Sequence, residues 1–327
     1  MELTVLGERE VYELLTVADC IAVMESAFRA VSAGKFAQPQ RLIAWLPGGR
    51  GAIGSMPAYL GDPDALAVKV ITVFPENRAA GLESHQGSVL LHETQTGRPL
   101  AIVHAGAVTA IRTAAVSALA ARILSNPRSA RLALLGSGTQ ARTHLEAMRA
   151  IRPIAKVKVW SRTPARAGAF AHVESARHGI PIEVAQSPRD AVNGCDIVCT
   201  LTAATAPVLE GAWLESGMHV SAAGSSVPPF RELDAAAVKR ARLFVDNREC
   251  VLNEADDLRV PIAEGAITAG HILGDLGELV TAEVAGRTSP DDITLFKSVG
   301  MAIEDVACAR ELYSRAQGRG RGTRVEY

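Results

Sequence analysis

The sequence predicts an α/β fold in which a doubly wound parallel sheet is joined to a β-rich α+β domain. Two glycines, spaced one residue apart, stand between an apolar run and a helical pattern at residues 132–151. Strand-like and helix-like segments then alternate to about residue 300, whereas before residue 106 short β-like runs follow one another across tight turns. At 327 residues the chain is long enough for about two domains of ~100–200 residues each.

The glycine turn carries the first indication of a ligand. Leu132 to Leu135 predict a short buried strand, and apolar residues recur at helical spacing from Ala141 onward. Gly136 permits the tight turn, Gly138 permits close approach of a pyrophosphate, and Ala141 keeps the helix near the sheet, as in a Rossmann dinucleotide fingerprint. The amides that open the helix, including those of Thr139 and Gln140, would then bind phosphate. The alternative interpretation is that these glycines only form the turn.

Alternating segments predict the rest of this Rossmann domain. Strands are expected at 132–135, 156–160, 182–184, 196–201, 219–224 and 242–247, with helices between them such as 163–179 and 233–241. This alternation is the pattern of parallel strands joined by crossover helices.

The N-terminal block has a different pattern. We expect one amphipathic helix over 14–35, strands at 41–46, 66–74, 88–93 and 99–105, and an alanine-rich helix at 109–125. A last helix is expected over 295–316. The tail 318–327, GRGRGTRVEY, is rich in glycine and arginine and is expected to be disordered and without function.

Composition excludes several classes of function. The formal net charge of −1 favours neither nucleic acid nor an anionic membrane as a partner. No apolar run approaches the ~18 residues that span a bilayer, and acids stand where a secretory signal carries basic residues, so a cytoplasmic enzyme is expected. The five cysteines are scattered, and Cys195 and Cys199 are interpreted as core residues; neither they nor the histidines predict a metal site.

The end of the second Rossmann strand indicates which cofactor is preferred. That strand is followed by Ser161, Arg162 and Thr163, with no carboxylate to bind the ribose hydroxyls of NAD. Arg162 could give the 2′-phosphate of NADP charge-assisted hydrogen bonds, so NADP(H) is predicted as the preferred cofactor and NAD(H) as a possible one. The alternative is an arginine that is merely solvated.

Long motifs in a fixed order resemble a known family. They are VKVITVFPEN, SHQGSVLLHETQTGRPLAIVHAGAVTAIRTAAVSALAAR, LLGSGTQAR, VWSRT, GSSVPPFRELD and LFKSVGMAIEDV. Together they resemble the ornithine cyclodeaminase/mu-crystallin family over almost the whole chain. The resemblance implies a substrate-binding and dimerisation domain of residues 1–113 with 304–327, a Rossmann domain of residues 114–303, and a homodimer.

The same resemblance implies the substrate site. Arg41, Lys69 and Arg112 match the cations that bind the substrate carboxylate and polarise the reacting carbon–nitrogen group in relatives, and Met56 matches a residue that lines the pocket. Lys69 lies in the apolar run LAVKVITVF, where burial would lower its pKa and suit it to proton donation. The alternatives are that the cations reach solvent and that Met56 only packs.

One position separates two chemistries within the family. Ornithine cyclodeaminases carry an aspartate in a G-G-D-C-P-like pattern where this chain has Ser226. A serine hydroxyl cannot act as a carboxylate base at neutral pH, so the reductase-like branch is favoured. Further positions carried over near the cofactor are Thr200, Leu201, Thr202, Ala203, Lys297 and Ser298.

The sequence therefore predicts an NAD(P)H-dependent reductase of a small α-imino acid, working in reverse as an amino-acid dehydrogenase, with Lys69, Arg112 and Ser226 at the reaction. The alternatives are an ornithine cyclodeaminase with internally recycled NAD and a ligand-binding protein like mu-crystallin. His85 and Asp275 stay ambiguous, because each could serve a functional loop or only make a structural hydrogen bond or helix cap.

Overall fold

In the computed structural model, which describes residues 2–326 and, at 78 and 79, the backbone alone, the chain divides into two units. One consists of residues 1–112 and 301–327, and the other of residues 113–300. We call them the mixed-sheet unit and the parallel-sheet unit.

The parallel-sheet unit contains eight strands in the order β10-β9-β8-β11-β12-β15-β13-β14, all parallel. Their bounds are β8 (Arg131–Leu135), β9 (Lys156–Trp160), β10 (Ile182–Val184), β11 (Ile197–Thr200), β12 (His219–Ala222), β13 (Arg242–Val245), β14 (Ile272–Asp275) and β15 (Thr294–Lys297). The chain turns to opposite sides of β8, which creates the switch point of a doubly wound sheet. The predicted fold class is confirmed.

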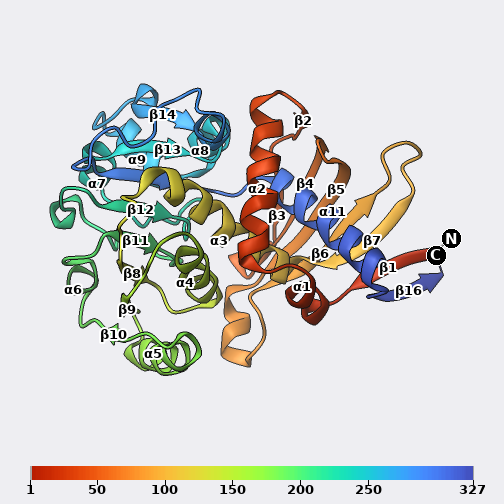
Figure 1. The fold of residues 1–327 in the computed structure, drawn as a ribbon, viewed down its shortest axis with the longest axis horizontal. Helices are drawn as coiled ribbons and strands as arrows, with labels where there is room; N and C mark the ends of the chain where they lie inside the picture. The colour runs from red at the N-terminus through yellow and green to blue at the C-terminus, as the bar shows by residue number, and fades with distance from the viewer. Residues whose placement is uncertain (1, 327) are drawn as a thin grey trace. The chain divides into compact units, whose positions relative to one another are not determined.

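Helices cover both faces of this sheet, as Figure 1 shows. They are α4 (Thr139–Ile151), α5 (Pro164–His178), α6 (Pro188–Val192), α7 (Ala235–Arg240), α8 (Arg248–Glu254), α9 (Asp256–Ala263) and α10 (Leu276–Val280). Successive side chains of β8 enter different cores: Leu132 and Leu134 pack with Leu145 of α4, whereas Ala133 and Leu135 join the core on the other face. A strand buried on both faces needs the continuous apolar run that predicted it.

The mixed-sheet unit contains a meander in which β4, β5, β6 and β7 pair antiparallel in succession. The sheet order is β16-β1-β7-β6-β5-β4-β2, with β3 also on β4. Bounds are β1 (Glu2–Leu6), β2 (Phe36–Ala37), β3 (Leu42–Trp45), β4 (Ala52–Gly61), β5 (Asp64–Val73), β6 (His85–His92), β7 (Pro99–His104) and β16 (Thr323–Glu326).

Helices α2 (Val17–Ser32) and α11 (Ala302–Arg319) lie over one face of this meander, and α1 (Glu8–Leu14) precedes them (Figure 1). The sequence predicted a single helix over 14–35, which is wrong at its start. The Thr16 side chain accepts a hydrogen bond from the Asp19 amide and begins α2, so the chain breaks between the two helices.

The C-terminal segment corrects two predictions. Residues 294–297 form β15 in the parallel sheet rather than the first turn of the last helix, which starts at Ala302. The tail is not disordered throughout, because Thr323–Glu326 pairs antiparallel with β1. Gly320 (φ 61°) ends α11 and Gly322 (φ 92°) turns the chain back to the sheet edge. Gly320 and Gly322, which predicted disorder, are therefore needed for a left-handed helix cap and a turn.

Helix α3 (Ala105–Leu124) runs across the boundary between the units and begins four residues earlier than predicted. Its length and composition would suffice to span a membrane, which corrects the expectation that no apolar run approaches that length. In the structure 83% of its apolar window is buried, as in the core helix of a globular domain.

Candidate active site

Lys69 lies on the covered face of β5, opposite Met56 of β4 and Val89 of β6. Its side chain is 3% exposed, and its Nζ lies 2.6 Å from Oδ2 of Asp305 on α11. The alternation of β5 explains the position, because Ala67 and Ile71 point to the same face and are also buried. The interpretation of Lys69 as a solvated strand residue is therefore wrong.

The environment of Lys69 lowers the affinity of its amine for a proton. Burial lowers the pKa to about 8; the Asp305 carboxylate opposes this, and the charges of Arg112 and Arg41 add to it. An amine with a pKa near 8 can be a charged acid or a neutral base close to neutral pH.

Arg112 enters the same cluster from α3. Its Nη1 donates to Oε2 of Glu304 at 2.7 Å, and its Nε lies 3.4 Å from Oδ1 of Asp305. Burial alone would lower the pKa of Arg112, but the carboxylates of Glu304 and Asp305 raise it. The guanidinium therefore stays charged, and Lys69 is the member of the cluster that can exchange a proton.

The buried cation cluster, as we call Lys69, Arg112, Glu304 and Asp305, balances two positive charges with two negative ones. Geometry leaves capacity in it: among the described residues, Arg112 Nε is a buried donor that forms an ion pair with Asp305 at 3.4 Å but no hydrogen bond. Arg41, in the loop before β3, is partly exposed and its positive charge reaches Lys69. An anionic ligand would complete such a set.

The two carboxylates of the cluster were missed from the sequence, although the motif MAIEDV contained them. The available signal was two adjacent acids in the helical run Ala302–Ala309, where the remaining residues are apolar. Because Glu304 is 0% exposed and Asp305 1% exposed, each requires a buried cation as a partner.

The parallel-sheet unit has a candidate site of its own at the glycine turn. Gly136 has φ 131°, and a Cβ there would lie 2.7 Å from the Leu201 carbonyl oxygen, so only glycine fits. A Cβ on Gly138 would meet nothing within 4 Å. Thr139, Gln140 and Ala141 form the first turn of α4 after that open space, and the Ala141 amide donates to the Gly138 carbonyl at 3.0 Å. The positive end of the helix dipole there favours a phosphate. The residues present fit a dinucleotide.

Ser161, Arg162 and Thr163 follow β9 and lead into α5, as expected, and Arg162 and Thr163 are exposed. A hollow beside the glycine turn is lined by Ser137, Arg142, Arg166, Phe170 and Glu174 among others. Two arginines therefore lie near the segment that was predicted to select the cofactor, and both come from the first turns of helices.

The remaining predicted cofactor residues gather where the central strands end. Thr200 is the last residue of β11, so Leu201, Thr202 and Ala203 follow its carboxyl end, and Ser226 follows β12 by four residues and is partly exposed. Lys297 ends β15 rather than lying in a loop, and Ser298 follows it. Ligands of doubly wound sheets bind at this edge.

Lys297 has an additional role that its motif did not reveal. Its side chain is 0% exposed, its Nζ lies 2.9 Å from Oδ2 of Asp257, and it donates to the carbonyl of Ser225. The lysine thus fixes the segment next to Ser226, whatever further contact it makes.

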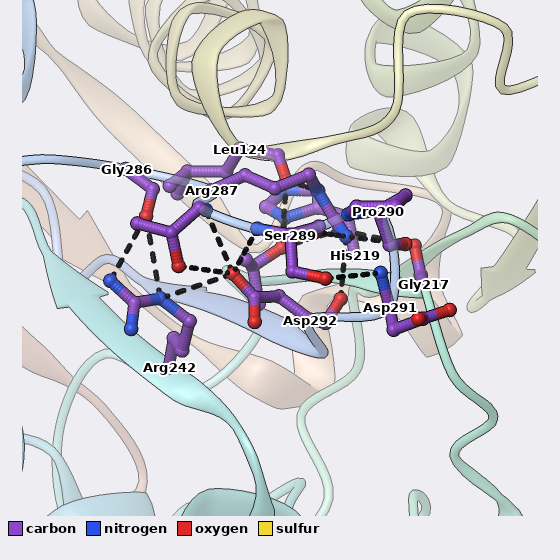
Figure 2. A network of polar contacts seen from close by, with 12 residues as sticks. Leu124, Gly217, His219, Arg242, Gly286, Arg287, Ser289, Pro290, Asp291 and Asp292 are labelled. Atoms are coloured by element: carbon purple, nitrogen blue, oxygen red, sulfur yellow. Dashed lines mark hydrogen bonds and ion pairs between the residues drawn. The ribbon is translucent and has the colours of Figure 1, made fainter.

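A polar network lies at the opposite end of the strands, where β12, β13 and β15 begin (Figure 2). Arg287 donates to the carbonyls of Leu124, Gly217 and Asp292, at 2.7, 3.0 and 2.6 Å. His219 accepts or donates at Thr294, which in turn donates to Leu124. Side chains and carbonyls thus satisfy one another in this network.

The two ambiguous residues now have partners. His85 begins β6 and shares a hydrogen bond with Ser84 at 3.0 Å. Asp275 forms a capping box with Glu278 at the start of α10, so the capping alternative is confirmed. The core assignment of Cys195 and Cys199 is also confirmed, since both are buried.

Comparison with known proteins decides the family. Residues 1–320 match the model of the ornithine cyclodeaminase/mu-crystallin family. The chain belongs to this family. It is 36% identical over 324 residues to a Delta(1)-pyrroline-2-carboxylate reductase of Bacillus cereus, with 99% of each chain covered.

Two solved structures are similar over their full length. The Delta(1)-pyrroline-2-carboxylate reductase of Thermococcus litoralis, in complex with NADH and L-proline, has a TM-score of 0.97 and 39% identity, covering 99% of this chain and 100% of that one. An archaeal alanine dehydrogenase dimer with bound NAD has a TM-score of 0.94 and 30% identity, with 100% of both chains covered.

Proposed function

We propose that this family member reduces a small cyclic α-imino acid of the pyrroline-2-carboxylate type, and in reverse oxidises the corresponding amino acid. The enzyme class, an NAD(P)-dependent oxidoreductase acting on C=N bonds, agrees with the names of its relatives. The observation that carries the proposal is the buried Lys69, whose pKa of about 8 lets it donate and recover a proton beside Arg112.

Each side chain has a separate task in this proposal. Arg112 and Arg41 bind the substrate carboxylate, because a guanidinium fork matches its two oxygens. Lys69 directs its ammonium to the imine nitrogen and supplies the proton, while Asp305 keeps that amine charged enough to do so. Met56, opposite Lys69 on β4, forms an apolar wall for the ring of the substrate. Ser226 donates a hydrogen bond to the nitrogen or a water.

A bound reduced nicotinamide supplies the hydride. The glycine turn at Gly136 and Gly138 would hold the pyrophosphate, and Thr200 to Ala203, with Lys297 and Ser298, would flank the nicotinamide end. The open space at Gly138 supports this assignment.

The direct test is oxidation of NADH and NADPH with a panel of imines. Pyrroline-2-carboxylate, its six-membered homologue and keto acids with ammonia or methylamine form the panel. We expect the cyclic imines to be reduced fastest. Absence of turnover on every imine, with nucleotide still bound, would instead indicate a mu-crystallin-like binding protein.

Incubation with ornithine separates the lyase alternative. A cyclodeaminase would release proline and ammonia without net change in nicotinamide absorbance. We expect no proline from ornithine, since Ser226 stands where the cyclodeaminase pattern has its aspartate.

For the cofactor, we propose a preference for NADPH over NADH through Arg162. This arginine is exposed beside Ser161 and Thr163, where a 2′-phosphate would lie, although the similar structures named above contain NADH or NAD. The charge-assisted contact gives about a tenfold to hundredfold preference. Arg162→Ala should remove that preference in kcat/KM and leave NADH kinetics unchanged; equal use of both cofactors by the wild type would contradict it.

We further propose that the chain forms a homodimer through the open face of the mixed sheet. Leu42, Ile53, Tyr59, Leu66 and Val70 all expose their side chains there, between 37% and 71%. The register of β3, β4 and β5 puts them on one face, opposite to Lys69. A continuous apolar face of this kind favours burial against a second copy.

Sedimentation equilibrium tests the dimer. Ile53→Glu should give a monomer because it buries a charge in the contact. Leu273→Glu is the matched control, since Leu273 is 42% exposed in the parallel-sheet unit and should leave the dimer intact.

A further inference from the structure

Glu232 is a buried carboxylate for which the proposed reaction has no use. It follows the GSSVPPF segment, is 0% exposed, and accepts four hydrogen bonds from two loops that end neighbouring strands. Oε1 accepts from the amide and hydroxyl of Thr202 at 2.6 and 2.8 Å. Oε2 accepts from the hydroxyl of Thr200 and the amide of Gly224 at 2.7 and 2.9 Å.

These four donors occupy the acceptor sites of an ionised carboxylate completely. A main-chain N–H faces each oxygen, and such a donor cannot turn away. A glutamine would therefore direct its NH₂ group at the amide of either Thr202 or Gly224, whichever way it is flipped. Only an acid in this position bridges both loops.

The two loops also touch through the main chain. A Cβ on Gly224 would lie 2.3 Å from the Thr202 nitrogen and 2.5 Å from Oε1 of Glu232, so the contact requires glycine. β11 and β12 are adjacent parallel strands, and β11 also pairs with β8, so the end of β11 lies beside the glycine turn. Glu232 thus fixes the distance between the segment after β11 and the segment that leads to Ser226.

Asp257 and Lys297 fix the main chain on either side of this contact. Oδ1 of Asp257 accepts from the amides of Glu232 and Leu233 at 2.7 and 2.9 Å. Oδ2 pairs with Lys297, which donates to the carbonyl of Ser225. These contacts form a closed chain from Glu232 through Asp257 and Lys297 to Ser225, which is next to Gly224, the residue whose amide donates to Glu232.

We propose that Glu232 is a positioning residue that sets the nicotinamide end of the cofactor site by clamping the Thr200–Thr202 and Gly224–Ser226 segments together. The inference rests on the proposed function and deepens it. Glu232 touches neither substrate nor cofactor in this account. Its removal should spare the adenosine half of the cofactor, which depends on the glycine turn, and loosen the nicotinamide half.

The test compares Glu232→Gln with Asp196→Asn. Asp196 is a carboxylate that also accepts two amide hydrogen bonds, from Ala130 and Arg131, but at the opposite edge of β8 and β11. Calorimetry with 5′-AMP measures the adenosine half, and calorimetry with the reduced dinucleotide measures the whole. Steady-state kinetics gives KM for the cofactor and kcat.

For Glu232→Gln we expect dinucleotide affinity and kcat each to fall about tenfold or more while the Kd of 5′-AMP stays within about twofold, since a buried donor is left unpaired. Asp196→Asn should change none of these ratios. Unchanged dinucleotide affinity and kcat, or a parallel loss of 5′-AMP binding, would overturn the inference.

If Glu232→Gln does not fold, Asp257→Asn carries the test, because it replaces the ion pair with Lys297 and weakens the support of the Glu232 main chain at a residue with no proposed cofactor contact. We expect about a threefold loss of dinucleotide affinity with 5′-AMP binding unchanged, and no loss would overturn the inference. The calorimetric measurements do not require turnover. A wild type that binds the dinucleotide but reduces no imine would therefore overturn the proposed function and leave this inference to be judged on binding.

Discussion

Asp305 and Glu232 are both buried carboxylates beside a lysine, yet their surroundings differ in one respect. Glu232 receives four hydrogen bonds from fixed donors. Asp305 instead pairs with two side chains, Lys69 at 2.6 Å and Arg112 at 3.4 Å, and burial lowers the pKa of that lysine to about 8. A buried carboxylate held by four fixed donors keeps two segments together, whereas one paired with a lysine that can lose its proton takes part in proton exchange.

The largest effect is expected at Lys69. If the buried cation cluster performs the chemistry, Lys69→Ala should lower kcat/KM about 10²–10⁴-fold in imine reduction. Lys158→Ala is the control, because Lys158 is a half-buried lysine of the parallel-sheet unit that donates to the carbonyls of Asp190 and Asn193. A change confined to KM would reduce Lys69 to a binding residue.

The next effect distinguishes the buried Arg112 from the partly buried Arg287. Arg112→Lys should raise the KM for the imine about tenfold to hundredfold, because a lysine cannot replace the planar fork on both a carboxylate and Glu304. Arg287→Lys, in the network of Figure 2, should lower the melting temperature and leave KM unchanged. Equal KM effects of the two variants would contradict the distinction.

The dependence of the reaction rate on pH tests whether Asp305 raises the pKa of Lys69. Reduction should slow as pH rises through about 8, where Lys69 loses its proton, and amino-acid oxidation should quicken. Because Asp305 raises the pKa of Lys69, Asp305→Asn should move this limb to lower pH. A limb that stays in place, measured by stopped-flow hydride transfer, would assign the titration to another group.

The smallest effect concerns stability rather than the site. Burial lowers the pKa of His144 to about 4 and, with the charges of Arg287 and Arg152, that of His219 to about 3. Between pH 6.5 and about 4 the unfolded state binds protons that these folded imidazoles do not. The free energy of unfolding should therefore fall by about 1.4 kcal/mol per pH unit for each histidine as the pH decreases.

His219→Gln should flatten this acid dependence in urea titrations at a series of pH values. His172→Gln, on an exposed position of α5, is the control and should leave the slope as in the wild type. An unchanged slope in His219→Gln would contradict the contribution of His219 to the acid dependence.

The fold was predictable where sequence pattern and packing agree. LALLGSGTQA specifies a strand, a turn and a helix locally, and the parallel sheet follows from repeated units of that kind. The prediction of a helix at residues 295–298 was wrong, because LFKS is too short to separate a buried strand from a helical turn by periodicity. The pairing of β16 with β1 was missed since it joins residues more than 300 positions apart.

The cationic residues of the candidate site could be predicted from the sequence, whereas its acidic residues were missed. An isolated lysine in LAVKVITVF demands a partner, but nothing in that run indicates which distant acid supplies it. Asp305 reaches Lys69 only because α11 crosses β5. Glu232 and Asp257 were likewise hidden, because their roles arise from loops that meet at the end of the sheet.

The most direct test of the account compares two inhibitors that differ in one group. Pyrrole-2-carboxylate and pyrrole-2-carboxamide share a planar ring, and only the first carries the charge that Arg112 and Arg41 are proposed to bind. We expect the wild type to bind the carboxylate at least about a hundredfold more tightly, and Arg112→Leu to lose most of that ratio. Equal inhibition of the wild type by both compounds would contradict the claim that the buried cation cluster recognises an anionic imine.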